Sequence, residues 1–301
     1  MSSTVQASPA FTVERRHPLI GTAVHGLDLS RRLEQTTVDA LHALWMEHLL
    51  LVFPGQAISD EQHVAFARCF GELEIHPSFA HRSTGNQAIY RVSNVDEDGN
   101  LIPQQDNGWQ YLSQSWRWHT DSSFRDIPSK GSILHGIEIT RDGGNTLFAN
   151  LYAAYEDLPY DMRARIDDLI VVHDHDHILS LSPLLAARKD KGRYETLPPV
   201  RHPLVQVHPV TGRRSLFLSP HTMTAVDGLG PEEGRALLDE LIAHATQPRY
   251  VYRHCWEPHD VIMWDNRCTM HSVEPFDNTN LRRVMHRVTL AGEGRPIPAR
   301  A

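Results

Sequence analysis

Short strand-like segments, separated by turns that contain glycine or proline, are the feature that most restricts how this chain can fold. Seven such segments alternate polar and apolar residues or run apolar, and they span residues 88–92, 132–138, 204–207, 215–218, 250–256, 261–264 and 283–290. The sequence at 207–212 predicts a turn that joins two of them into a hairpin. Many short strands with few long helices are typical of a β-sandwich or β-barrel. We therefore predict a mainly β protein with flanking helices.

Helical periodicity or capping patterns occupy several gaps between these segments. Helix starts are predicted at Thr36 or Thr37, at Ser59, near Leu151, near Tyr160 and at Pro231. The first helix is expected to end at Pro54-Gly55. Although 301 residues could form two domains, barrels of this size are routinely one, so residues 12–301 are predicted to form a single domain. The segment 180–199 lacks a core-forming period and is a candidate mobile lid, and residues 1–11 are expected to be disordered.

His119 and Asp121 lie one residue apart in Trp118-His119-Thr120-Asp121. On an extended strand these two side chains project to the same face, while Thr120 points back. With His271 as a third ligand, two imidazoles and a carboxylate would hold one face of an octahedral ion and leave three positions open. Non-haem Fe(II) oxygenases use this arrangement, whereas a third imidazole would suit zinc better. Because the chain contains 20 histidines, a His-x-Asp pair alone also arises by chance.

A rival metal site is the run His173-Asp174-His175-Asp176-His177. Alternation on a strand would place three imidazoles on one face, which could suit zinc or nickel. However, consecutive side chains on one face stand roughly 6.5–7 Å apart, so three from a straight strand rarely converge on one ion. We interpret the run as a pocket rim or a surface feature.

Composition favours small-molecule chemistry. The formal net charge is −8 with a pI near 6.2, and no run of Lys or Arg suggests a nucleic-acid or anionic-membrane surface. The three cysteines, Cys69, Cys255 and Cys268, are an odd number at wide spacing, as in a reduced cytoplasmic protein. No apolar stretch approaches the roughly 18 residues of a membrane span, and the N-terminus lacks the apolar core of a signal peptide. We expect a cytoplasmic protein that contacts neither membranes nor nucleic acid.

The spacing of several polar residues carries a family resemblance. Twenty-four residues separate Asp121 from Thr146, 124 separate Thr146 from His271, and eleven separate His271 from Arg283. Four longer blocks surround these positions, and they are 118–124, 143–156, 264–268 and 282–287. Over most of residues 20–292 the chain resembles the TauD/TfdA family of Fe(II)/2-oxoglutarate dioxygenases, which includes taurine and 2,4-dichlorophenoxyacetate dioxygenases.

The resemblance implies a fold, a chemistry and a set of site residues. The fold would be a double-stranded β-helix, the jelly-roll variant of β architecture, and the protein a homo-oligomer. His119, Asp121 and His271 would bind Fe(II), with 2-oxoglutarate and O2 as co-substrates. Arg283 would hold the distal carboxylate of 2-oxoglutarate, with a hydrogen bond from Thr146.

The strand predicted at 283–290 bears on the same site. A period of two places Arg283 and Arg287 on one face, while Arg282 points the other way and is expected to be solvated or structural. A charged, solvated sheet edge would give the same pattern. By resemblance, Arg287 would face the substrate or the co-substrate.

The substrate is predicted to be a small organic anion. By resemblance His76 would contact its anionic group, and Phe79 stands where the taurine enzyme has a tyrosine. Further candidate pocket residues are Ser115, Trp118 and His221. A carboxylate such as an aryloxyalkanoate and an alkyl sulfonate or sulfate both remain open, because different blocks resemble different family members.

Two other classes of protein would use the same three ligands. One is a non-catalytic jelly-roll metal-binding or sensor protein, and the other is a zinc hydrolase. Neither would need Thr146 and Arg283, so both are disfavoured.

Overall fold

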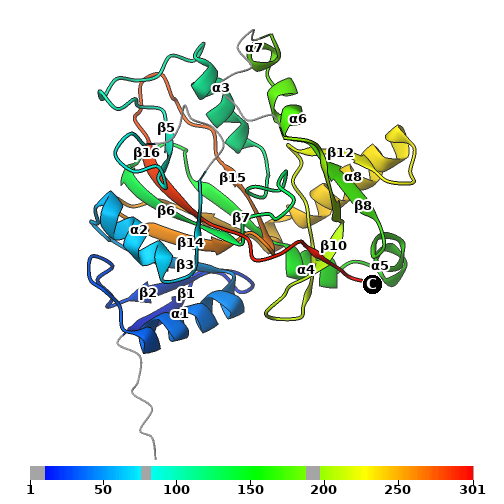
Figure 1. Ribbon diagram of the computed structural model, residues 1–301, viewed down its shortest axis with the longest axis horizontal. Helices are drawn as coiled ribbons and strands as arrows, with labels where there is room; N and C mark the ends of the chain where they lie inside the picture. Colours follow the sequence, from blue (N-terminus) through cyan, green and yellow to red (C-terminus); the bar gives the residue numbers. More distant parts are fainter. Residues whose placement is uncertain (1–10, 76–82, 188–196, 301) are drawn as a thin grey trace, which may run out of the picture.

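One large β-sheet forms the centre of the molecule (Figure 1). The computed structural model describes residues 11–75, 83–187 and 197–300, and all structural statements refer to these ranges. Along the sheet the order is β1 (Thr12–Arg15), β2 (Thr22–His25), β3 (Leu50–Phe53), β14 (Val261–Asp265), β6 (Gly131–Glu138), β16 (Val284–Leu290) and β4 (Leu73–Glu74), with β5 (Tyr90–Ser93) also paired to β16. The neighbours are antiparallel except for the parallel pair β2 and β3.

A three-stranded antiparallel sheet packs against this large sheet. Its order is β13 (Val251–His254), β7 (Thr146–Asn150) and β15 (Thr269–Val273). Phe148 of β7 and Trp264 of β14 are buried with their ring centroids 5.4 Å apart. Met285 of β16 belongs to the same apolar cluster. The space between the two sheets is therefore a hydrophobic core.

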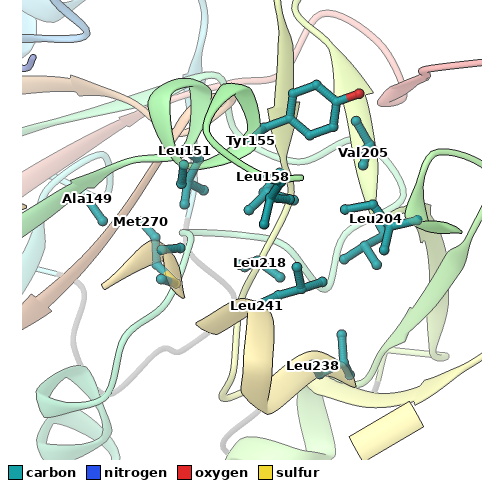
Figure 2. Packing of buried hydrophobic residues seen from close by; sticks show 14 of the residues in the cluster. Ala149, Leu151, Tyr155, Leu158, Leu204, Val205, Leu218, Leu238, Leu241 and Met270 are labelled. Carbon is teal, nitrogen blue, oxygen red and sulfur yellow. The ribbon is translucent and has the colours of Figure 1, made fainter. Parts of the chain in front are cut away.

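Two further three-stranded sheets and several helices continue the fold. They are β11 (Arg214–Leu216), β10 (Val205–Val207) and β17 (Ile297–Pro298), and β12 (Met223–Val226), β8 (Ile170–His173) and β9 (Val200–Pro203). Helices α4 (Leu151–Glu156), α5 (Tyr160–Ile166) and α8 (Pro231–Ala245) accompany them. Figure 2 shows Leu151, Leu218, Leu241 and Met270 meeting in the cluster that joins these parts. Because neighbouring residues of a strand face opposite sides, the burial of Met270 here turns His271 away from this core.

The first two helices cover the large sheet. Helix α1 (Gln35–His48) begins after Glu34, whose side chain makes no capping hydrogen bond, and Leu49 ends it in the left-handed conformation at φ 64°. The prediction that this helix begins at Thr36 or Thr37 and continues to Pro54 is therefore wrong, because residues 50–53 form β3. A fully buried apolar run fits either structure by pattern alone, and pairing with β14 decides for a strand. In contrast, the capping box of Ser59 and Gln62 at α2 (Asp60–Arg68) is confirmed.

The mainly β architecture with flanking helices is confirmed. All seven predicted strands are present within a few residues, and β10 and β11 form the predicted hairpin. The helix starts near Leu151 and Tyr160 and at Pro231 are also confirmed. Strands β7 and β15 are among the strands that were not predicted, because each mixes polar with apolar residues without a strict alternation. Among the described helices, none is long and apolar enough to cross a bilayer.

Two predicted flexible segments are only partly described. Of residues 1–11, only Phe11 lies inside the described range, and it packs against the cluster beneath α1 and α2. The candidate lid 180–199 includes α7 (Pro183–Ala186), and its residues 188–196 lie outside the described ranges. Leu185 of α7 is buried against Tyr111 and Phe124, so the expectation that this segment adds nothing to a core is wrong at Leu185. Whether it moves as a lid stays a prediction.

Candidate active site

His119 and His271 meet through their backbones. Each amide nitrogen donates to the other residue's carbonyl oxygen at 2.8 Å, which makes an isolated antiparallel bridge. Residues directly opposite each other in an antiparallel pair send their side chains to the same face. The two imidazole rings accordingly lie with their centroids 4.1 Å apart, although 151 residues intervene in the sequence.

Asp121 completes a three-residue cluster. Its Oδ1 lies 3.9 Å from Nε2 of His119 and 3.9 Å from Nε2 of His271. One ligand atom from each of the three buried residues lies within 4.8 Å of the others, which fits one metal ion. The carboxylate is fixed at both oxygens, because Ser132 Oγ donates to Oδ2 at 2.7 Å and Arg287 Nη1 donates to Oδ1 at 2.5 Å.

The protonation states of the three residues suit metal binding. Nδ1 of His119 lies 2.9 Å from the carbonyl oxygen of Arg117, which assigns the ring proton to Nδ1 and leaves the Nε2 lone pair for a ligand bond. Burial lowers the pKa of His119 and lowers that of His271 well below its ordinary value. Burial is the largest single influence on Asp121 and opposes its ionisation, but Arg287, the two imidazoles and the Ser132 hydrogen bond together outweigh it and hold the carboxyl pKa well below its usual range. Two neutral imidazoles and one carboxylate are the donor set expected for Fe(II).

A second cluster, His208, Asp265 and Cys268, has metal-like spacing but does not suit an ion. Arg267 already binds the Asp265 carboxylate through Nε at 2.9 Å and Nη2 at 2.7 Å. His208 Nδ1 accepts hydrogen bonds from the backbone amides of residues 210–211. Its proton is therefore on Nε2, which donates to Asp265 at 3.1 Å. This cluster is a buried ion pair with its hydrogen-bond partners satisfied.

A cavity of about 70 Å³ is lined by two of the three ligand residues, His119 and Asp121. His221, Arg287 and Ser115 add polar groups to its wall. The imidazole of His221 stacks on that of His119 with a centroid distance of 4.6 Å. The rest of the wall is mostly apolar or aromatic, and includes Tyr90, Val92, Tyr111, Leu112, Phe124 and Ile178. The cavity therefore joins a metal-binding end to an apolar end.

Arg283 lies in an adjoining hollow of about 20 Å³. The two spaces share Val92, Leu112 and Ser115 as lining residues. Arg283 Nε donates to the carbonyl oxygen of Gly144 at 3.0 Å, but Nη2 has no hydrogen-bond partner among the described residues. Burial lowers the guanidinium pKa to about 10. A buried cation without a counterion is costly, so this hollow is suited to an anion.

Thr146 stands at the start of β7 with its side chain buried. Its Oγ1 accepts a hydrogen bond from Trp256 Nε1 at 3.0 Å. A hydroxyl that accepts in this way keeps its own proton available for another acceptor. Thr146 pairs across the sheet with Val273, and Val273 lines the Arg283 hollow.

Larger hollows lie elsewhere, and one of about 430 Å³ is lined by Leu29, Phe66 and Cys69, among others. A hollow of about 290 Å³ lies near the C-terminus and is lined by Phe217, Asn266 and Pro296, among others. The Lys130 ammonium and the Glu293 carboxylate at its wall neutralise each other. It contains neither a ligand cluster nor an unpaired charge among the described residues, so the smaller cavity beside Asp121 is the better reaction site.

Other predicted site residues have mixed outcomes. Ser115 and His221 line the cavity as predicted, and Arg282 is exposed and paired with Glu138. Trp118 packs against the hydrophobic cluster that includes α8 and is not among the residues that line the cavity beside Asp121, so its role in the pocket stays a prediction. His76 and Phe79 lie outside the described residues.

The run from His173 to His177 does not form one strand face. Strand β8 ends at His173, and Asp174 caps helix α6 (His175–Ser180). His173 bonds Thr222 and His175 bonds Tyr111, so the interpretation as a surface feature is wrong for these two buried residues. Of the three histidines only His177 is partly exposed, while Asp174 is partly exposed and Asp176 is exposed.

Sequence reasoning missed the residues that shape the cavity. Tyr111 lies on α3 (Asn107–Leu112), Phe124 on the loop after Asp121, and Ile178 on α6. No local sequence pattern predicts that these three segments meet at the cavity. Ser132, which contacts Asp121, was assigned only to a strand. Alternation along 132–138 could have indicated its face, but not its partner.

Comparisons with known proteins agree with this site. The family described as taurine catabolism dioxygenase TauD, TfdA family matches residues 12–289. The (S)-phenoxypropionate/alpha-ketoglutarate-dioxygenase of Sphingobium herbicidovorans is 36% identical over 293 residues, which cover 95% of this chain and 96% of that protein. The alpha-ketoglutarate-dependent 2,4-dichlorophenoxyacetate dioxygenase of Cupriavidus pinatubonensis is 36% identical over 277 residues, or 91% and 95% of the two chains. A crystal structure of AAD-2 in complex with Mn(II) and N-oxalylglycine is 34% identical, with a TM-score of 0.86 and coverage of 95% and 99%.

Proposed function

This chain belongs to the TauD/TfdA family, and we propose from that membership how its residues serve an Fe(II)/2-oxoglutarate-dependent dioxygenase and which substrate it takes. The reaction couples oxidative decarboxylation of 2-oxoglutarate, to succinate and CO2, to hydroxylation of a small organic anion. The cluster of His119, Asp121 and His271 within 4.8 Å is the observation that carries this function.

His119, Asp121 and His271 would hold Fe(II). The bound iron would supply activation of O2. His119 and His271 contribute Nε2, and the Asp121 carboxylate offsets part of the ion's charge. The apolar wall of the cavity excludes water from the reacting groups.

Arg283 and Thr146 bind the distal carboxylate of 2-oxoglutarate. The support is the unpartnered Nη2 of Arg283, buried in a hollow next to the ligand cluster. A guanidinium offers two parallel donors to a carboxylate, and the Thr146 hydroxyl can add a third. The aromatic rings of Trp109, Trp116 and Phe276 contact one another and line the same hollow.

The substrate is an aryloxyalkanoate. Arg287 faces the cavity while its guanidinium carbon lies 4.7 Å from the centroid of the Tyr90 ring, and this cation would bind the substrate carboxylate. Tyr111, Phe124 and Ile178 would contact the aryl ring. Two similar relatives act on phenoxypropionate and 2,4-dichlorophenoxyacetate, which favours a carboxylate over the alkyl sulfonate or sulfate that the sequence leaves open.

Hydroxylation at the carbon beside the ether oxygen fits this placement. The C–H bond there is replaced by C–OH, and the resulting hemiacetal or hemiketal loses the aryloxy group. The hydroxyl proton goes to the aryloxy oxygen, so a phenol and a 2-oxo acid are released.

Several broader expectations stay predictions. The apolar core between the large sheet and the β13-β7-β15 sheet supports a jelly-roll arrangement. Homo-oligomerisation and a cytoplasmic location rest on resemblance and composition alone. A zinc hydrolase or a silent metal-binding protein is disfavoured, because neither accounts for buried Arg283, whose Nη2 has no hydrogen-bond partner among the described residues.

Succinate production tests this function. The protein is incubated with Fe(II), ascorbate and 2-oxoglutarate, together with phenoxyacetate, phenoxypropionate enantiomers, an alkyl sulfate or an alkyl sulfonate. We expect succinate and phenol in equal amounts with an aryloxyalkanoate. Succinate with only the sulfate or sulfonate would move the substrate class, and no succinate with any member of the set would count against the function.

A further inference from the structure

A buried hydrogen-bond chain runs from Asp121 away from the cavity. Ser132 Oγ donates to Asp121 Oδ2 at 2.7 Å, and Asn266 Nδ2 donates to Ser132 Oγ at 3.3 Å and to Ser129 Oγ at 2.9 Å. Ser132, Ser129 and Asn266 are at most 1% exposed. None of these three residues was singled out by the sequence as part of the site.

The direction of each bond in this chain follows from its far end. Trp264 Nε1 can only donate, and it lies 2.8 Å from Asn266 Oδ1, which assigns the orientation of the amide. The amide nitrogen of Asn266 therefore faces Ser132 and donates to its oxygen. Because the Ser132 hydroxyl already accepts there, its single proton is directed to Asp121.

The hydrogen bond from Ser132 gives the two carboxylate oxygens of Asp121 different roles. Oδ2 is turned toward Ser132, while Oδ1 lies 3.9 Å from Nε2 of both His119 and His271. A carboxylate oxygen has two lone pairs, so Oδ1 can ligate a metal while it also accepts from Arg287.

We propose that Ser132 and Asn266 are positioning residues that make Asp121 ligate the metal through Oδ1 alone. The inference rests on the proposed function and deepens it. Ligation through one oxygen leaves a coordination position that a carboxylate bound through both oxygens would occupy. Asn266 acts indirectly, because it reaches Asp121 through Ser132.

The test compares metal binding by Ser132→Ala, Asn266→Ala, the double variant and the wild type. Ser215→Ala is the matched control, because Ser215 is 0% exposed and, within the described ranges, its hydroxyl donates to the carbonyl oxygen of Leu216 and to no metal ligand. Mn(II) affinity is measured by titration without 2-oxoglutarate, and the position of the Fe(II)–2-oxoglutarate absorbance band is recorded without O2. Thermal midpoints and near-ultraviolet circular dichroism establish that each variant is folded.

Loss of a hydrogen bond that orients a metal ligand typically lowers metal affinity or activity by about 10–100-fold. We expect Ser132→Ala to weaken Mn(II) binding at least about tenfold and to shift the absorbance band, while Ser215→Ala changes neither. The double variant should match Ser132→Ala, since Asn266 acts through Ser132. If Asn266→Ala does not fold, the comparison of Ser132→Ala with Ser215→Ala still tests the positioning role of Ser132.

Two outcomes would overturn the positioning role while the wild type still binds metal. One is a Ser132→Ala protein with wild-type Mn(II) affinity and an unshifted band, and the other is additive effects of the two substitutions. A wild-type protein that binds no Mn(II) would instead contradict the proposed function itself.

Discussion

Arg287 Nη1 donates to Oδ1 of Asp121 at 2.5 Å. The carboxylate oxygen that faces both candidate imidazole ligands therefore also accepts a hydrogen bond from a guanidinium. Strand alternation explains the contact, because Arg287 on β16 faces the inter-sheet side together with Met285, while His286 turns to Asp60 of α2. The same guanidinium lines the cavity. Arg287 is thereby placed to sense both the ligand carboxylate and a substrate anion.

Arg287→Ala should remove the preference for anionic substrates. A charge-assisted hydrogen bond contributes about 1.5–3 kcal/mol, so kcat/KM for an aryloxyalkanoate should fall at least about tenfold. The amide analogue should lose little. The measurement is succinate production at saturating Fe(II), so that weaker metal binding does not enter the comparison. Arg282→Ala, on the exposed side of the sheet, is the control, and an unchanged ratio of anionic to neutral turnover would contradict the anchor.

Arg283→Lys should raise KM for 2-oxoglutarate by about tenfold or more. The substitution keeps a positive charge but loses the two-pronged donor geometry. The substrate KM should change less, because Arg283 lies in a separate hollow. Steady-state kinetics with each co-substrate varied in turn give both constants. Arg282→Lys serves as a neighbour control, and a co-substrate KM equal to that of the wild type would remove Arg283 from this role.

Thr146→Val should raise the same KM. Valine matches the shape of threonine but lacks the hydroxyl, and one hydrogen bond to a charged carboxylate contributes about 1.5 kcal/mol, or roughly tenfold. The Trp256 Nε1 proton would lose its acceptor, so the thermal midpoint should also fall. A lower midpoint with an unchanged KM would make Thr146 a structural residue only.

Acid should destabilise the fold through a cluster of buried histidines beneath α2. Burial lowers the pKa of His63 to about 3, and burial with the nearby His259 and His286 lowers that of His135 to about 4. Asp60, the remaining charged neighbour, acts in the opposite direction. Because the unfolded chain binds protons near pH 6.5 and the folded chain does not, stability is lost as pH falls from about 6.5 toward 3–4.

His63→Leu should flatten this acid dependence. His63 alone accounts for about 3 kcal/mol of stability lost between pH 7 and pH 4. Urea unfolding across that pH range measures the change, with His177→Leu on α6 as the control. If the free energy of unfolding falls as steeply between pH 7 and pH 4 in His63→Leu as in the wild type, other groups govern the acid dependence.

The sequence supplied the ligand set more readily than the cavity around it. His119 and Asp121 were predicted from the alternation of side chains along an extended strand, and His271 from its spacing to Thr146 and Arg283. The backbone bridge between His119 and His271 then brings the three residues together. Arg283 and Arg287 follow from the period of their strand. Such patterns are local, and regular secondary structure turns them directly into geometry.

Errors arose where tertiary structure chooses between equal local patterns. Residues 50–53 are apolar enough for a helix or a buried strand, and the neighbouring strands select the strand. At 173–177 the Asp174 side chain caps a new helix, which breaks the expected alternation. Ser132 and Asn266 are ordinary small polar residues, and only their contact with a metal ligand makes them functional candidates.

The central claim is that His119, Asp121 and His271 together hold Fe(II) with 2-oxoglutarate, and its most direct test is the visible absorbance of that complex. Fe(II) is added without O2 to the wild type, His271→Ala and His177→Ala, each with 2-oxoglutarate present. We expect a charge-transfer band for the wild type and for His177→Ala, and none for His271→Ala. A band of wild-type intensity in His271→Ala would contradict the claim.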